Sequence, residues 1–256
     1  MHPYFDHRGT TRLALLIPAL LVLVGFAAMP AHAQTIVAPN AFATTNGGSR
    51  ASSAPFNDVS RYQQIYAASQ FSALSGPELI TQIAFRPATN QRAFTHTDSH
   101  IQFDFSTNAE AVSSLSSTFA NNVGSNDQVV YNSALTFTST GAPASGAGPF
   151  DIVVKLTNPF LYDPAAGNLV LDIRNFDPSF TGFFDLGSDP STRLVFVDNS
   201  TTSATGTVQP FGLVTQFTFA PAVPEASTTV SLGLLLALGM GGVVVAGKRK
   251  KNNATS

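Results

Sequence analysis

The chain has 256 residues, no cysteine and no tryptophan, and its formal net charge at pH 7 is only −2. Without cysteine no disulfide can form, so a hydrophobic core alone must hold the fold. Nineteen of the 21 phenylalanines lie between Phe42 and Phe219 and are expected to form much of that core. The region from Gln34 to Ala220 carries thirteen acidic and seven basic residues. This acidic balance repels phosphate backbones and excludes nucleic acid as an expected partner.

The N-terminus has the features of a secretory signal peptide. Arg8 and Arg12 precede the uncharged apolar stretch Leu13–Ala28, and Ala31 and Ala33 supply the two small residues that a signal peptidase recognises. We therefore predict a signal peptide over residues 1–33, with cleavage after Ala33. The alternative is an N-terminal membrane anchor that stays attached.

Residues 34–220 are predicted to form one all-β domain, because apolar and polar residues alternate in many short runs. In Ile101–Ser106, for example, Ile101, Phe103 and Phe105 share one face. Gly, Pro, Asn and Asp clusters separate the runs, which favours antiparallel strands in a β-sandwich, with the jelly roll as one form of it. The other expected strands are 36–37, 79–86, 128–131, 134–139, 150–156, 169–174, 194–198 and 213–219.

One segment departs from this alternation. Thr107-Asn108-Ala109-Glu110 resembles a capping box, and Val112, Leu115 and Phe119 follow at helical spacing. The pattern predicts one short helix near residues 108–120, although its serines compete with helix formation.

His96, Asp98 and His100 are the first metal-ligand candidates. In an extended chain these alternate residues point to one side, where two imidazoles and a carboxylate suit a zinc-like ion. The same parity continues to Gln102 and Asp104, however, so this side is expected to be the solvated face of an ordinary strand.

A second cluster contains Asp177, Asp185 and Asp189, whose oxygens suit structural calcium. The spacing is not that of an Asp-x-Asp-x-Asp-Gly loop, and Asp before Pro forms turns on its own. No bound metal or other cofactor is therefore expected, and structural calcium remains the alternative.

The sequence gives little support for an enzyme. It lacks a Gly-x-Ser-x-Gly elbow, a phosphate-binding glycine loop and a cysteine nucleophile. Glu78 and Glu110 are the only glutamates of the domain, and each has a local structural explanation. We expect no catalytic residue; a secreted hydrolase is the weaker alternative.

A binding module is the more serious alternative, because exposed aromatic side chains can stack on sugar rings. The candidates are Tyr62, Tyr66, Tyr131, Tyr162 and the pair Phe183-Phe184. The competing interpretation places these aromatics in the core.

The C-terminus combines three features. Val223, Pro224 and Glu225 lie in a linker over 221–229, and an uncharged apolar run over 230–247 is long enough for a transmembrane helix. Lys248, Arg249, Lys250 and Lys251 then begin the tail 248–256, which the positive-inside rule places in the cytoplasm.

This C-terminus resembles the PEP-CTERM sorting signal of bacterial exported proteins, although Ala226 stands where that motif normally has a second proline. The resemblance covers about residues 223–251. It implies recognition of Val223, Pro224 and Glu225 by an exosortase-like membrane enzyme, and association with exopolysaccharide. The domain itself resembles uncharacterised members of this group only loosely, through Arg61–Tyr66 and Phe160–Ile173.

These features predict an exported, non-enzymatic protein, anchored at least transiently by its C-terminal helix and delivered to the cell surface or extracellular matrix. The molecular activity of the domain does not follow from the sequence. A carbohydrate- or calcium-binding module is the alternative function.

Overall fold

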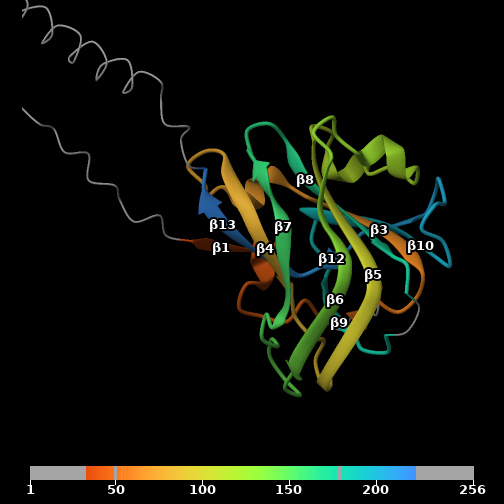
Figure 1. Ribbon diagram of the computed structural model, residues 1–256. Helices are drawn as coiled ribbons and strands as arrows, with labels where there is room; N and C mark the ends of the chain where they lie inside the picture. The colour runs from red at the N-terminus through yellow and green to blue at the C-terminus, as the bar shows by residue number, and fades with distance from the viewer. Residues whose placement is uncertain (1–32, 49–50, 53, 178–179, 223–256) are drawn as a thin grey trace, which may run out of the picture. The chain divides into compact units, whose positions relative to one another are not determined.

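The structure is a computed structural model that describes residues 33–222 except 49–50, 53 and 178–179. The described strands form three antiparallel sheets, which confirms the predicted all-β class (Figure 1). The four-stranded sheet has the order β1 (Gln34–Ala38), β13 (Thr215–Pro221), β4 (Glu78–Phe85) and β7 (Ile152–Tyr162).

The six-stranded sheet has the order β11 (Thr207–Gln209), β10 (Thr192–Asp198), β3 (Ser60–Tyr66), β8 (Asn168–Asn175), β5 (Arg92–Asn108) and β6 (Gln128–Gly141). A small third sheet joins β12 (Gly212–Leu213), β9 (Phe184–Gly187) and β2 (Ala51–Ser52). The two weaker predicted strands 128–131 and 134–139 are one continuous strand, β6.

The main core lies between the two larger sheets and is rich in phenylalanine, as the composition predicted. Phe71 packs against Tyr162 and Phe217, with ring centroids 5.0 and 5.3 Å apart. Phe56 packs against Phe137 and Phe184 at 5.2 and 4.7 Å. Phe71 lies in a 3-10 helix and Phe56 in a loop, whereas their partners Tyr162, Phe217, Phe137 and Phe184 lie on strands, of which one side faces the core.

A buried polar network also joins the sheets inside the core. Tyr62 donates a hydrogen bond to Gln64 Oε1 at 2.5 Å, and Gln64 Nε2 donates to Thr192 Oγ1 and to the Leu213 carbonyl. Burial raises the pKa of the Tyr62 hydroxyl well above its ordinary value, so this donor stays protonated. The network therefore fixes β3 and β10 against the segment that leads into β13.

The predicted helix over 108–120 is wrong. Two short 3-10 helices, Val112–Ser114 and Phe119–Asn122, occupy the segment instead. Asn108 Oδ1 accepts a hydrogen bond from the Glu110 amide at 2.7 Å, which makes a local turn rather than a helix cap. The other described 3-10 helices are Asn40–Phe42 and Ala68–Phe71.

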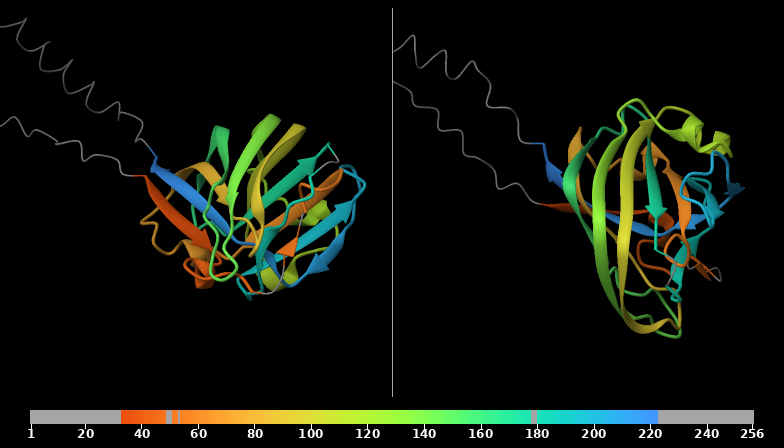
Figure 2. Two further views of the ribbon diagram at one scale, coloured as in Figure 1. Left: turned by 90° about the horizontal axis from the view of Figure 1, so that it is seen from below. Right: turned by 45° about the vertical axis from the view of Figure 1, so that its right-hand side comes forward.

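We call residues 109–127, which include these two helices, the lobe. The lobe lies at one end of the row formed by β7, β6 and β5 (Figure 2, right). It packs against the outer face of the six-stranded sheet through a second apolar cluster. That cluster contains Ile65, Val112, Leu115, Phe119, Val170 and Val195. The part of the outer face around Ile65, Val170 and Val195 is consequently covered.

Arg86 and Asp185 form an ion pair that is completely buried, with both side chains 0% exposed and Nη2 2.6 Å from Oδ2. Arg86 also donates to the Thr45 carbonyl and lies over the Phe150 ring, and the Gly47 amide donates to Asp185 at 3.0 Å. The ion pair thus connects three segments to one another: the chain just after β4, the loop 45–47, and β9. Burial raises the pKa of Asp185, although the Arg86 charge opposes this shift.

Replacing Arg86 by alanine is expected to lower the free energy of unfolding by about 3–5 kcal/mol, because Asp185 would remain as a buried charge without its partner. Arg92→Ala is the matched control, since Arg92 is exposed, and should change stability by less than ~0.5 kcal/mol. Urea denaturation measures both. Combining Arg86→Met with Asp185→Leu should recover most of the loss, and equal effects of the two alanine variants would contradict the assignment.

Candidate functional site

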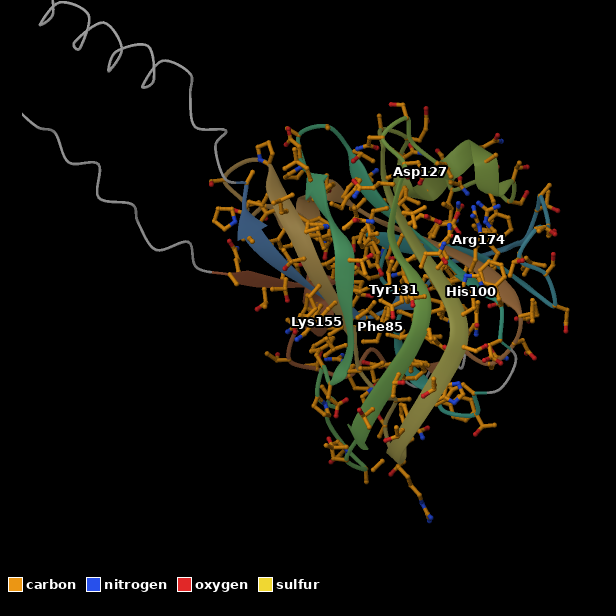
Figure 3. The ribbon with its side chains drawn as sticks, in the orientation of Figure 1. Phe85, His100, Asp127, Tyr131, Lys155 and Arg174 are labelled. Carbon is orange, nitrogen blue, oxygen red and sulfur yellow. The ribbon has the colours of Figure 1, made fainter. Side chains whose placement is uncertain are left out.

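The outer face of the six-stranded sheet carries a polar cluster of six side chains: Arg61 and Gln63 on β3, Asp172 and Arg174 on β8, and Gln102 and Asp104 on β5. The strand register brings them together. Gln63 and Asp172 are direct cross-strand neighbours, and Asp172 is in turn opposite Asp104. Figure 3 labels Arg174 of this cluster.

Asp172 is the centre of the cluster and is only 3% exposed. Its Oδ2 is 2.6 Å from Arg61 Nη2, and Arg61 Nε donates to both carboxylate oxygens at 3.2 Å. Gln63 Nε2 donates to the same Oδ2 at 2.6 Å. These charge-assisted bonds compensate the desolvation of the Asp172 carboxylate.

Asp104 is equally buried but has weaker partners. Gln102 Nε2 donates to its two oxygens at 3.0 and 2.8 Å, and Arg174 Nη1 is 3.9 Å away. Burial raises the pKa of Asp104 to about 6; the Gln102 hydrogen bond lowers it and the Asp172 charge raises it further. Burial and Asp172 also raise the pKa of Asp127.

Two adjacent carboxyl groups are a pattern that acid–base catalysts use. Here the side chains of Asp104 and Asp172 are only 4% and 5% exposed. A substrate in solution therefore has no direct route to either carboxyl group in this conformation. The contacts of the cluster instead connect the sheet to the lobe.

Asn122 makes that connection. Its Nδ2 donates to Gln63 Oε1 at 3.0 Å and to the Ser116 carbonyl at 2.9 Å, while its Oδ1 accepts from the Ser116 amide at 2.8 Å. Arg61 lies over the Phe119 ring, with its guanidinium carbon 4.6 Å from the ring centroid. The polar cluster and the second apolar cluster together hold the lobe in place.

A pocket of about 310 Å³ opens where the lobe meets the sheet. Its walls combine amide, hydroxyl, carboxylate and aliphatic groups. The lining residues are Ile65, Asn108, Glu110, Ala111, Ser114, Leu115, Ser116, Asn121 and Asn122. The pocket is within the lower part of the size range of small-molecule sites.

The structure separates the predicted His96–Asp98–His100 group. His96 Nε2 is 3.0 Å from Asp98 Oδ1, and Asp98 is completely buried, whereas His100 is exposed and stacks on Phe176 with a centroid distance of 4.2 Å. The register shifts between Asp98 and Ile101, where β5 has one residue more than β6. This β-bulge reverses the parity, so the expectation that Asp98 faces solvent is wrong.

Burial raises the pKa of Asp98 to about 6, and its hydrogen bond to His96 opposes the shift. The Oδ2 atom of Asp98 has no hydrogen-bond partner among the described residues. His96 and Asp98 thus form a pair at the core boundary, and His100 lies on the other side of β5.

Asp177, Asp185 and Asp189 have separate local contacts. Asp177 accepts from the Ser99 amide, which lowers its pKa; Asp185 pairs with Arg86; and Asp189 accepts from the Ser191 amide. Within the part of the chain that the structure describes, there is no group of three or more His, Asp or Glu residues arranged to hold a metal ion.

Most of the aromatic candidates for sugar stacking lie in the core. Tyr62, Tyr66, Tyr162 and Phe184 are at most 1% exposed, and only Phe183 of this set is strongly exposed, at 49%. Tyr131 is partly buried, and its hydroxyl donates to the Ala134 carbonyl. The core interpretation of these residues therefore holds for the four buried side chains.

The predicted sorting and membrane residues lie outside the described residues, except Ala33, which is exposed. This applies to Ala31, to Val223, Pro224 and Glu225, to the span 230–247 and to Lys248–Lys251. Over the described residues, no helix has the length and apolar character needed to cross a membrane.

Comparison of the chain with known proteins identifies no relative. No family model matches it, and no curated protein or solved structure matches it significantly.

Sequence reasoning missed both the polar cluster and the pocket. The signal was present as charged and amide residues on the polar face of three runs: Arg61 and Gln63, Gln102 and Asp104, Asp172 and Arg174. Nothing in these runs shows that β8 lies between β3 and β5, and that order is what brings the six residues together.

The raised pKa of Asp104 has a measurable consequence for stability. The folded protein holds this proton more tightly than the unfolded chain, so the stabilisation is complete below about pH 4 and is lost as pH rises through about 6. Asp104→Asn removes this contribution. In urea denaturation the variant should show a flatter fall in unfolding free energy between pH 4 and 7, and should be about 1–3 kcal/mol more stable than the parent at pH 8.

Glu78→Gln is the control, because the described residues make no hydrogen bond to that side chain and it lies on another sheet. It should retain the pH dependence of the parent. If Asp104→Asn also retained it, the buried Asp104 carboxyl would not be its source.

Proposed function

We propose that the protein is an exported, non-enzymatic component of the cell surface or extracellular matrix of a bacterium, sorted through its PEP-CTERM-like C-terminus. Signal peptidase and an exosortase-like membrane enzyme are the proposed processing partners, and exopolysaccharide is the proposed surrounding material. The anchor would be the apolar span 230–247, followed by the basic tail.

The observation that carries this proposal is where the described strands begin and end relative to the two predicted cleavage sites. The first described strand begins at Gln34, directly after the predicted cleavage site at Ala33, and the last described strand ends at Pro221, two residues before Val223. These strands pair with each other, with Gln34 opposite Phe219. Cleavage after Ala33 and near Glu225 would therefore leave every described strand intact.

Burial of the carboxyl groups supports a non-enzymatic role. The cross-strand pair Asp104 and Asp172 is buried, and its carboxyl groups are hydrogen-bonded to Gln102, Arg61 and Gln63. A glycosidase needs two carboxyl groups that flank an accessible bond. The arrangement of this pair fits a structural contact better.

The strand orders further support assigning the sandwich to the jelly-roll type. The sheet β1-β13-β4-β7 faces a sheet containing the consecutive strands β3-β8-β5-β6, so each sheet mixes early and late strands as two Greek keys do. Strands β10 and β11 extend the second sheet beyond β3. Sandwiches of this type commonly serve as display scaffolds, which fits a surface protein.

Mass spectrometry of the mature protein from native cells tests the sorting proposal. The expected N-terminus is Gln34, and the expected C-terminus lies near Val223–Glu225. Replacing Glu225 by alanine should leave the C-terminal processing incomplete, so that precursor accumulates in the membrane fraction at the expense of surface material.

Glu110→Ala is the matched control, because it also removes one glutamate but lies far from the motif in sequence. It should be processed like the parent protein. Recovery of the full-length parent chain from the soluble cytosolic fraction would overturn the proposal.

A further inference from the structure

We infer that the pocket between the lobe and the six-stranded sheet binds a neutral sugar residue. The inference is independent of the sorting signal, because every lining residue lies between Ile65 and Asn122. It goes beyond a passive structural role for the domain, and it assigns ligand binding to residues that the sequence did not single out for this purpose.

The walls of the pocket are held in position before any ligand arrives. Asn108 Nδ2 donates to the Asn122 carbonyl at 2.8 Å, and Asn168 Nδ2 donates to the Glu110 carbonyl at 2.7 Å. Asn121 Nδ2 donates to Ser116 Oγ at 3.3 Å. Because the walls are already fixed, binding costs little conformational entropy. A small ligand that makes only a few contacts can therefore still bind.

Glu110 and Ser114 supply polar groups that these contacts leave free to bind. Among the described residues, Glu110 is bonded only through its backbone, by its amide to Asn108 and by its carbonyl to Asn168. Its carboxylate and the Ser114 hydroxyl, both on exposed residues, form no hydrogen bond with another described residue. A carboxylate can accept from two neighbouring hydroxyl groups, as a sugar ring offers them.

The apolar part of the pocket fits the carbon skeleton of a sugar. Ile65 and Leu115 are 2% and 8% exposed and belong to the second apolar cluster, and Ala111 lies beside them in the lining. Aliphatic contacts of this kind cover the C–H groups of a pyranose, while amide and carboxylate groups orient its hydroxyls. The volume of about 310 Å³ suits one ring rather than a long chain.

Electrostatics select a neutral ligand over an acidic one. Glu110 is the one ionisable residue among the nine described residues that line the pocket. Behind the wall, Asn122 contacts Gln63, which contacts the buried Asp172. An anionic sugar would meet the Glu110 carboxylate without a lining cation to offset the repulsion.

The test uses the full chain, purified in a detergent without a sugar headgroup, such as lauryldimethylamine oxide. Saturation-transfer NMR is recorded with glucose, galactose, mannose and N-acetylglucosamine, and with glucuronate as the anionic comparison. At least one neutral sugar should bind with a dissociation constant in the millimolar range, and glucuronate should bind more weakly than glucose.

Ser114→Phe should fill the pocket and lower the affinity at least ~10-fold. Ser113→Phe is the matched control: Ser113 is exposed in the same 3-10 helix but does not line the pocket, so this variant should keep the affinity of the parent. Thermal unfolding followed by circular dichroism checks that both variants fold.

Glu110→Gln keeps the test decisive even if Ser114→Phe fails to fold. It should weaken neutral-sugar binding by roughly 10-fold and reduce the discrimination against glucuronate. Absence of binding by all four neutral sugars would overturn the inference, and so would equal binding by the Glu110→Gln variant and the parent. Equal loss of affinity in folded Ser113→Phe and Ser114→Phe would also overturn it.

Discussion

Burial of part of the outer face of the six-stranded sheet is the constraint on which the rest of the candidate site depends. An antiparallel sheet can leave one face to water, but here the lobe covers part of that face and packs on Ile65 and Val170. Polar side chains on the covered part must therefore find partners within the protein. Asp172 does so through Arg61 and Gln63, and Gln63 in turn contacts Asn122 of the lobe.

The same constraint explains both the raised pKa of Asp104 and the pocket. Asp104 lies opposite Asp172, and only one of the two carboxylates has a close arginine, so burial favours the protonated form of Asp104. The 3-10 turns keep the lobe close to the sheet at Phe119 and Asn122, while Glu110 and Ser114 border an opening. A regular helix over the same residues would present a different set of side chains to the sheet, since its spacing is 3.6 residues per turn.

Much of the fold could be predicted from local pattern. Alternation located the strands around Ile101–Ser106 and Leu169–Arg174 correctly, because the period of two is a property of a half-buried strand itself. The same reasoning failed at Asp98, because a bulge between Asp98 and Ile101 adds one residue to β5 and brings Asp98 to the same side of the strand as Ile101. It also failed at 108–120, where the Asn108 side chain and the serines favour turns over a helix.

The charged contacts were beyond local pattern for a different reason. Arg86 and Asp185 are 99 residues apart, and Arg61 and Asp172 are 111 apart. Pairing each arginine with its carboxylate requires the strand order and the register, which depend on long-range packing.

The amino-acid sequence by itself determined the all-β class, the phenylalanine-rich core and the positions of most strands, because these follow from composition and from side-chain alternation within a few residues. The tertiary structure alone decided which polar residues meet, that Asp98 is buried, and that Glu110, Ser114 and Asn122 border a common pocket. Those outcomes depend on which strands become neighbours and on how the lobe packs on the sheet. Neither the strand order nor this packing can be read from a short stretch of sequence.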